Sequence, residues 1–258
     1  MTRFMIAAPS SGAGKTTLTL ALMRIFQRKG IYFQPAKSGP DYIDPKFHEV
    51  AAGRSSLNLD AWAMPSTQVA SLAGSGNLII EGAMGLFDGA GLQGRGSAGD
   101  LAETLTLPVI LVVDAAKIAH SVSAIVQGFS KFNSKVNVVG VFLNRVGSAR
   151  HLNMLRSALD STGVPIFGYL FRSATFALPE RHLGLVQASE TKALDDWINT
   201  IANALEPSLD LDALVKLSAP VTTTEKFKQQ PPAQRIAIAR DIAFEFSYPH
   251  QLDSWQAA

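Results

Sequence analysis

The fold is decided by residues 4–17, F-M-I-A-A-P-S-S-G-A-G-K-T-T, near the start of the chain. An apolar run of strand type leads into a glycine-bearing loop, and a helical pattern begins near Thr16. Gly12 and Gly14 let the backbone curl so that successive N–H groups point inward, where they can bind a phosphate. The start of the helix adds the positive end of its dipole. This order of strand, loop and helix predicts a phosphate-binding loop.

Two side chains of this loop have their own expected roles. Lys15 can reach the β- and γ-phosphates of a nucleoside triphosphate, and the Thr16 hydroxyl can bind Mg²⁺, so we expect ATP and Mg²⁺ here. The common pattern G-x-x-x-x-G-K-[ST] has glycine at position 9, where this chain has Pro9. The alternative interpretation is a chance turn before a helix, which the flanking strand and amphipathic helix disfavour. The expected nucleotide-binding residues of the loop are Ser11, Gly12, Ala13, Gly14, Lys15, Thr16 and Thr17.

The composition bounds the class of protein. The chain has 258 residues, 47% hydrophobic and 17% charged, enough for one large α/β domain with a sizeable core. Lys and Arg number 23 against 21 Asp and Glu, so we expect no nucleic-acid partner. No apolar run approaches the roughly 20 residues of a membrane span, and the N-terminal run is too short for a signal peptide. A cytoplasmic protein that binds no membrane is therefore expected. The chain has no cysteine, which excludes disulfides, thiolate metal sites and a cysteine nucleophile.

Apolar runs of strand type alternate with helical patterns along the chain. Most of these runs are continuous, as in strands that are covered on both faces, so the sequence predicts a mostly parallel, doubly wound α/β sheet with helices on both faces. The expected strands are Phe4–Ala8, Ile31–Ala36, Leu78–Ile80, Val109–Val113, Val138–Leu143 and Ile166–Leu170. The expected helices are Thr16–Lys29, Lys117–Lys131, Ala149–Ser161 and Thr191–Leu205.

The composition changes in the last fifth of the chain. Residues 218–234 are polar and contain several prolines, which predicts a linker after a domain of residues 1–217. Residues 235–258 begin with the strand-like run R-I-A-I-A and continue with several aromatic residues. We expect this part to be either the start of a further domain or a segment that docks on the first one.

Chemically suggestive side chains follow the expected strands, at the sheet edge where parallel α/β folds bind ligands. Glu81 ends an apolar strand, where a phosphate-loop NTPase places a carboxylate that binds Mg²⁺ directly or in its second shell. Lys37 can stabilise a transferring phosphoryl group. Asn144 carries the two-sided amide that can bind adenine. The alternatives are a polar strand end, a solvated lysine and a helix-capping asparagine.

Three carboxylates stand in the neighbouring loops. Asp41, Asp44 and Asp88 could complete the metal site or orient the reacting groups, and the alternative is that they are turn residues. His48 and His182 are isolated in the sequence and lack metal-ligand spacing.

Several strings together resemble one known family. K-S-G-P-D-Y-I-D-P at residues 37–45 and E-G-A-M-G-L-F-D-G at residues 81–89 are specific to it, and the phosphate loop is compatible with it. The chain resembles the N-terminal ATP-dependent synthetase domain of the cobyrinic acid a,c-diamide synthases. That domain is a P-loop fold of the dethiobiotin synthetase type and is related more distantly to the MinD/ParA ATPases. The resemblance covers residue 3 to about residue 205, and residues 235–249 resemble the junction at which the family's glutaminase domain begins.

The resemblance implies a reaction and its partners. ATP phosphorylates a carboxylate of cobyrinic acid, or of a related tetrapyrrole polycarboxylate, and ammonia then displaces phosphate from the acyl phosphate. Ammonia comes from a glutaminase domain or subunit that uses a cysteine, or from solution, and a homodimer is a further expectation. Because this chain has no cysteine and no glutaminase domain, we expect it to use free ammonia and not glutamine.

The resemblance also implies roles for individual residues. Gly12, Gly14, Lys15 and Thr16 hold the phosphates. The resemblance assigns Thr16, Asp41 and Glu81 to Mg²⁺, and Lys37 to the γ-phosphate in transfer. It assigns Tyr42, Asp44 and Asp88 to the carboxylate or acyl phosphate, and Asn144 to adenine. It also implies that the loop Pro179–Leu183, with Pro179 and Arg181, covers the nucleotide or the substrate. The expected catalytic residues are Lys15, Lys37, Asp41, Tyr42, Asp44 and Asp88.

Two other functions compete with this interpretation. A regulatory ATPase of the MinD/ParA type usually carries a lysine early in the loop, and Ser10 stands there instead. The same ligase chemistry could act on nickel-sirohydrochlorin or on hydrogenobyrinic acid, and the sequence does not separate these acceptors. The arginines that could meet the acceptor's carboxylates, or lie unengaged on the surface, are Arg54, Arg95, Arg145, Arg172 and Arg181.

Overall fold

The centre of the molecule is a seven-stranded sheet in which every strand pairing is parallel. The strand order is β3-β2-β4-β1-β5-β6-β7, which places β1 in the middle. This arrangement confirms the parallel, doubly wound α/β fold. The strands are β1 (Arg3–Ala7), β2 (Gln34–Ser38), β3 (Leu57–Leu59), β4 (Leu78–Glu81), β5 (Pro108–Asp114), β6 (Asn137–Val146) and β7 (Ile166–Phe171). The computed structural model describes residues 1–176, 187–191, 193–221, 227–241 and 243–258.

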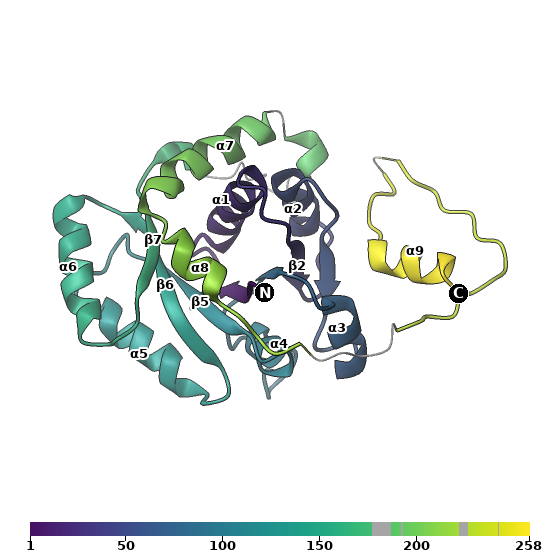
Figure 1. The fold of residues 1–258 in the computed structure, drawn as a ribbon, viewed down its shortest axis with the longest axis horizontal. Coiled ribbons are helices and arrows are strands. Elements are labelled where there is room, and N and C mark those ends of the chain that lie inside the picture. The colour runs from purple at the N-terminus through teal and green to yellow at the C-terminus, as the bar shows by residue number, and fades with distance from the viewer. Residues whose placement is uncertain (177–186, 192, 222–226, 242) are drawn as a thin grey trace.

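Helices cover both faces of the sheet (Figure 1). One face packs against α1 (Lys15–Arg28), α2 (Asp44–Ala52), α7 (Leu194–Leu205) and α8 (Leu211–Lys216). The other face packs against α3 (Ser66–Ala73), α4 (Ala98–Thr104), α5 (Val122–Phe132) and α6 (Ala149–Asp160). A further helix, α9 (Pro249–Gln256), lies beside β3 and is drawn in yellow apart from these layers.

The alternation of side chains along β1 explains why residues 4–7 are all apolar. Met5 and Ala7 point into the core under α3 to α6, whereas Phe4 and Ile6 point into the core under α1, α2 and α7. Both faces of residues 4–7 are therefore buried, and the polar residue of the strand, Arg3, stands at its start and donates to the carbonyls of Gly74 and Gly76. The carboxyl end of this central strand leads directly into the phosphate loop.

Several details of the expected secondary structure are wrong. The helices α2, α3, α4, α8 and α9 were not expected, and α5 begins at Val122 and not at Lys117. β3 was not expected, because a three-residue strand that contains Asn58 leaves almost no periodic signal. β2 begins at Gln34 and includes Lys37, so this lysine lies within the strand. Asn144 likewise lies within β6 and does not follow it.

Residues 235–239 form no strand, contrary to the strand-like run in the sequence. Ile236 and Ile238 are 38% and 49% exposed, and the segment pairs with none of the described strands. Strand preference reflects packing on a pleated, half-buried surface, and this segment has no neighbouring strand that would supply it.

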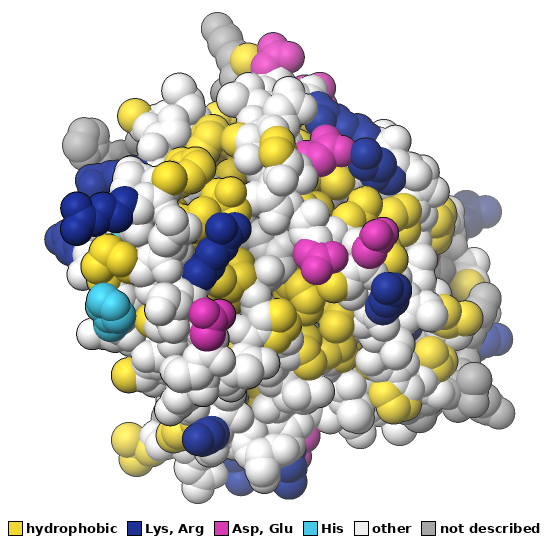
Figure 2. Space-filling view, turned by 60° about the vertical axis from the view of Figure 1, so that its left-hand side comes forward, with side chains coloured by type: hydrophobic (Ala, Val, Ile, Leu, Met, Phe, Trp, Pro, Cys, Tyr) yellow, Lys and Arg dark blue, Asp and Glu magenta, His cyan; other side chains and the backbone are white. Residues whose placement is uncertain are grey.

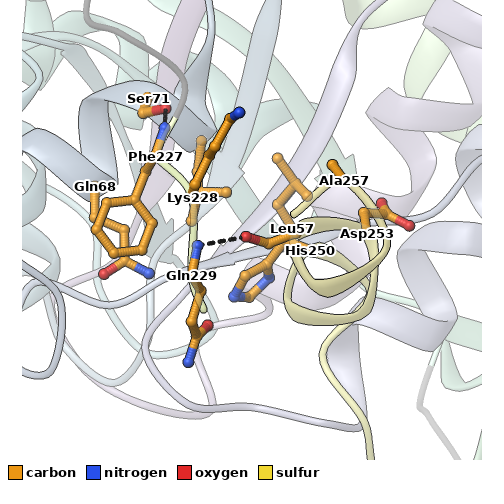
Figure 3. Close-up of a pocket in the computed structure, with 11 residues that line it drawn as sticks. Leu57, Gln68, Ser71, Phe227, Lys228, Gln229, His250, Asp253 and Ala257 are labelled. Carbon is orange, nitrogen blue, oxygen red and sulfur yellow. Dashed lines mark hydrogen bonds between the residues drawn. The ribbon is translucent and has the colours of Figure 1, made fainter. Parts of the chain in front are cut away.

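The C-terminal segment nevertheless contacts the sheet domain. The Phe227 amide donates to Ser71 Oγ of α3 at 2.7 Å, and the Gln229 amide donates to Ser254 Oγ of α9 at 2.7 Å. Between α9 and the β3–α3 side of the sheet lies a cavity of about 360 Å³. Figure 3 shows this cavity with Phe227 beside Gln68 on one side and α9 on the other. The first of these bonds joins the segment to the sheet domain, and the second joins two parts of the segment itself.

The surface shows no dominance of one charge. On the face in Figure 2, Lys and Arg side chains are interspersed with Asp and Glu, and apolar patches lie between them. Within the described ranges, none of the helices has the length and apolar character needed to cross a membrane.

Candidate active site

The phosphate loop connects β1 to α1 and has the backbone that its glycines predict. Gly12 and Gly14 have φ angles of 78° and 91°, in the left-handed region that favours glycine. Gly14 is also the N-cap of α1, and no side chain caps that helix end. Its N–H groups therefore face the loop, where an anion can accept from them.

Asn144 supports this loop from β6. Its Nδ2 donates to the carbonyl of Ala13 at 2.9 Å, and its Oδ1 accepts from the Arg145 amide at 2.9 Å. A Cβ on Gly14 would lie 2.0 Å from Asn144 Nδ2, so the amide also occupies the space that glycine leaves open. Asn144 holds the loop in shape here, and its contact with adenine remains a prediction.

The loop after β4 packs against the phosphate loop. Lys15 Nζ donates to the carbonyl of Met84, and the Leu86 amide donates to the carbonyl of Ala8 at 2.8 Å. Burial lowers the pKa of Lys15, an effect that the nearby Glu81 carboxylate partly opposes. The ammonium is thus held close to the loop by a neutral acceptor that a phosphate oxygen can replace.

Asp88 shapes the same β4 loop. Its Oδ2 accepts from the Gly85 amide at 3.1 Å, and a Cβ on Gly85 would lie only 2.2 Å from that oxygen. Beside it, an apolar groove of about 440 Å³ starts at Pro9 and runs along α5. Its other lining residues are Phe87, Asp88, Ala124, Ile125, Gly128, Phe129 and Phe132.

Glu81 ends β4 and is fully buried. Its Oε1 accepts from Thr16 Oγ1 at 2.7 Å and from Lys37 Nζ at 3.0 Å, and its Oε2 lies 2.8 Å from His48 Nε2. Burial alone would raise the pKa of Glu81, but Lys37 and the contacts of His48 and Thr16 lower it well below its usual range. The carboxylate therefore stays ionised in the interior.

Lys37 lies opposite Glu81 in the register of β2 and β4. Its Nζ contacts Asp44 Oδ2 and Glu81 Oε1 and lies 3.9 Å from Asp41 Oδ2. Burial alone would lower the pKa of Lys37, but Glu81, Asp44 and Asp41 outweigh it and raise that pKa above its usual range. Burial and the Glu81 charge raise the pKa of Asp44 to about 6, against the opposing effect of Lys37. We call Thr16, Lys37, Asp44, His48 and Glu81 the ion cluster.

His48 was wrongly taken as isolated. It is completely buried, and besides Glu81 it contacts Ser56 Oγ through Nδ1 at 3.0 Å. His48 and Asp44 lie four residues apart at the start of α2, hence on one face of that helix. The helical spacing D-x-x-x-H was the signal in the sequence that could have placed His48 beside the carboxylates.

The loop between β2 and α2 is fixed by polar contacts. Asp41 Oδ1 accepts from the amides of Ile43 and Asp44 at 2.8 and 3.1 Å. Asn58 Nδ2 donates to the carbonyls of Gly39 and Asp41 at 3.0 and 2.6 Å. Asp41 thus orders the backbone from which Asp44 reaches Lys37.

The other expected residues are more scattered. Ser11 lies on the exposed loop and contacts Met84 Sδ at 3.5 Å, and Thr17 lies in the first turn of α1. Arg145 pairs with Asp114 at 2.6 Å. Tyr42 stacks on residues near the C-terminus and not on the ion cluster. Pro179, Arg181 and His182 lie outside the described residues.

Thr16 and Glu81 fit a magnesium site in chemical terms. Both supply hard oxygen donors, and Mg²⁺ often takes only one or two protein ligands and completes its shell with phosphate oxygens and water. No group of three or more His, Asp or Glu among the described residues is arranged to hold a metal ion. Lys37 already occupies the space between the carboxylates, so Asp41 as a third ligand remains a prediction.

The fold and the loop together define a P-loop nucleotide-binding protein. Residues 4–186 match the family model described as the CobQ/CobB/MinD/ParA nucleotide binding domain, and the chain belongs to this family. This confirms the relationship that the sequence strings indicated.

The chain is also similar to longer proteins of known name. It is 47% identical to the hydrogenobyrinate a,c-diamide synthase of Brucella ovis and 49% identical to that of Rhizobium meliloti, in both cases over 99% of this chain. The chain spans 61% of the length of these relatives. Among solved structures, chloroplast FtsY of Physcomitrella patens is 16% identical with a TM-score of 0.46, covering 78% of this chain and 65% of that one. That likeness is too remote to bear on function.

Proposed function

We propose that this chain activates a carboxylate of a corrin-type tetrapyrrole with ATP, as the first half of an amidation at the a and c side chains. The observation that carries this proposal is the buried ion cluster, which joins the phosphate loop to Lys37 through Glu81. The names of the similar proteins support hydrogenobyrinic acid as the acceptor. Cobyrinic acid and nickel-sirohydrochlorin are the alternatives.

The chemistry requires two anions to meet. A carboxylate oxygen of the acceptor attacks the γ-phosphorus, the bond to the β-phosphate oxygen breaks, and ADP leaves. Ammonia then attacks the acyl carbon, phosphate leaves, and the nitrogen loses a proton. The first step brings two negative groups together, so fixed positive charge at the site lowers its barrier.

The residues of the site have distinct tasks in this proposal. The loop amides and the N-terminus of α1 bind the phosphates, and Lys15 exchanges the carbonyl of Met84 for a phosphate oxygen. Lys37 supplies positive charge where the acceptor and the γ-phosphate meet. Mg²⁺, held by Thr16 and Glu81, would neutralise phosphate charge when bound.

The acceptor is large, and its body has to lie outside the ion cluster. The apolar groove beside Pro9 begins at the phosphate loop and is lined by aromatic rings: Phe87 stacks on Phe129 at 5.7 Å and lies tilted against Phe132 at 4.7 Å. A tetrapyrrole presents broad apolar faces that suit such a surface. We therefore place the face of the macrocycle against this groove, with one carboxylate directed toward Lys37.

The nitrogen donor is part of the proposal. Glutamine hydrolysis through a thiol needs a cysteine, and the 258 residues contain none. Ammonium is therefore the expected donor for this chain by itself, with a glutaminase partner as the alternative source. ATP-dependent biosynthesis of this kind fits a cytoplasmic location.

The test is ADP release by the pure chain with ammonium and a panel of acceptors. Hydrogenobyrinic acid, cobyrinic acid and nickel-sirohydrochlorin are compared with diaminopelargonic acid as a non-tetrapyrrole control. Only the true acceptor should stimulate turnover, with formation of its amide, and Lys15→Ala and Glu81→Ala should abolish ADP release. Stimulation by diaminopelargonic acid alone, or a normal rate in either variant, would refute the proposal.

A further inference from the structure

The ring of Tyr42 is enclosed by residues from near the C-terminus. It stacks on Phe246 at 5.1 Å with an interplanar angle of 12°, and on Tyr248 at 4.6 Å with an angle of 21°. Tyr248 in turn stacks on His250 at 5.5 Å. The ring of Tyr42, which the resemblance had assigned to the substrate site, therefore packs against residues 244–250.

Residues 244–250, which we call the aromatic strap, are themselves anchored on both sides of Tyr42. Ser189 Oγ donates to Glu245 Oε2 at 3.4 Å, and His250, only 8% exposed, belongs to α9, which contacts β3. Burial raises the pKa of the Tyr248 phenol, as do its hydrogen bond with Tyr42 and the nearby carboxylates. The strap is thus partly withdrawn from water and tied to the sheet domain.

The loop that carries Tyr42 is the one that sets the ion cluster. On one side, Asn58 of β3 binds its backbone, and on the other side the strap holds Tyr42. Between them Asp41 caps two amides, and Asp44 reaches Lys37. A displacement of Tyr42 would therefore be transmitted to Lys37 within a few bonds.

We propose that Phe246 and Tyr248 are positioning residues: by clamping Tyr42 they fix the loop 39–44 and, through Asp44, the place of Lys37. The strap thus helps to position the phosphoryl-transfer site, although it lies at the far end of the sequence. The effect on turnover rests on the function proposed above, whereas the effect on the loop does not.

The chain offers a matched control for this proposal. Phe244 and Phe246 are two residues apart and 61% and 57% exposed, but only Phe246 stacks on Tyr42. Replacing either by leucine keeps the apolar character and removes the ring. Phe246→Leu and Tyr248→Leu test the clamp, Phe244→Leu tests the loss of any exposed ring, and Tyr248→Phe tests the ring without its hydroxyl.

The experiment measures hydrogen exchange of the Ile43 and Asp44 amides, together with basal and acceptor-stimulated ADP release. Because an aromatic pair contributes about 1 kcal/mol, we expect Phe246→Leu and Tyr248→Leu each to speed that exchange and lower kcat by about three- to tenfold. KM for ATP should change less than about twofold, since the clamp does not touch the phosphate loop. Tyr248→Phe, which keeps the ring, should have a kcat near the parent value, unlike Tyr248→Leu. Phe244→Leu should match the parent in both amide exchange and kcat. The melting temperature of each variant identifies global unfolding.

The outcomes separate the two proposals. Unchanged amide exchange in both clamp variants, faster exchange with unchanged kcat, or an equal effect of Phe244→Leu would each overturn the positioning role. If no tetrapyrrole stimulates the parent chain, the proposed function fails, and amide exchange with basal ATP hydrolysis still decides the role of the strap.

Discussion

Replacing Lys37 by methionine is the sharpest test of the ion cluster. Methionine keeps much of the volume but removes the ammonium that contacts Glu81 and Asp44, whose side chains are 0% and 23% exposed. Removing one partner of a buried ion pair typically costs about 3–5 kcal/mol. Because Asp44 is partly open and Glu81 keeps its contacts with Thr16 and His48, we expect a loss of about 2–4 kcal/mol at pH 8.

The dependence on pH follows from the same charges. Without Lys37, the pKa of Glu81 should rise above that of the unfolded chain, and the pKa of Asp44, which is already raised to about 6, should rise further. A carboxyl group with a raised folded-state pKa stabilises the fold at low pH and loses that contribution as pH rises through the folded-state value. The variant should therefore be less destabilised at pH 5 than at pH 8.

Urea unfolding at both pH values measures this effect. Lys46→Met is the matched control, because Lys46 is 31% exposed and pairs with Glu49 at 3.3 Å on the surface of α2. Such a pair contributes about 0–1 kcal/mol. The double variant Lys37→Met/Glu81→Gln should regain part of the lost stability and remain inactive in ADP release. If Lys37→Met unfolds like Lys46→Met at pH 8, the electrostatic account of the cluster is wrong.

Three further predictions test the loop, the groove and the nitrogen donor. Gly14→Ala should abolish binding of a fluorescent ATP analogue, because its Cβ would fall 2.0 Å from Asn144 Nδ2, whereas Gly12→Ala, with no atom within 4 Å of its Cβ, should weaken binding less. Gly128→Leu should fill the groove and raise KM for the tetrapyrrole at least about fivefold. Because a Cβ at this position meets no atom within 4 Å, the thermal stability should not fall. An unchanged KM would exclude the groove as the binding site of the tetrapyrrole. With the parent chain, ammonium should support amide formation and glutamine should not, and turnover with glutamine by the pure chain would contradict this.

The sequence predicted the elements whose signal is local. The apolar run of β1, the left-handed glycines and the start of α1 follow one another in the chain, so their order alone defined the phosphate loop. Lys37 and Glu81 were correctly taken as neighbouring charges because parallel strands bring their ends to one edge. The contact between the two, at 3.0 Å, required the register of β2 against β4, which the sequence does not state.

The residues that were misjudged depend on contacts between distant segments. His48 meets Glu81 only because α2 packs on the sheet beside β4. The resemblance assigned Tyr42 to the substrate site, and no local signal showed that its ring packs on Phe246 and Tyr248, from near the other end of the chain. Strand propensity at residues 235–239 had no partner strand to act on. For His48 and Tyr42 the deciding partner lies far away in the sequence and leaves no periodic signal.

A single carboxylate oxygen connects the three motifs that the sequence singled out. Oε1 of Glu81 accepts from Thr16, in the phosphate loop, and from Lys37, in the K-S-G-P-D-Y-I-D-P string. If the Thr16 hydroxyl turns toward a bound nucleotide, this oxygen loses one donor, and the balance of charge around Lys37 changes with it. Lys37 is then the remaining donor to this oxygen, and Asp44 contacts the same ammonium. Under the proposed function, we expect occupation of the phosphate loop to change the charge around Lys37 through this one shared oxygen.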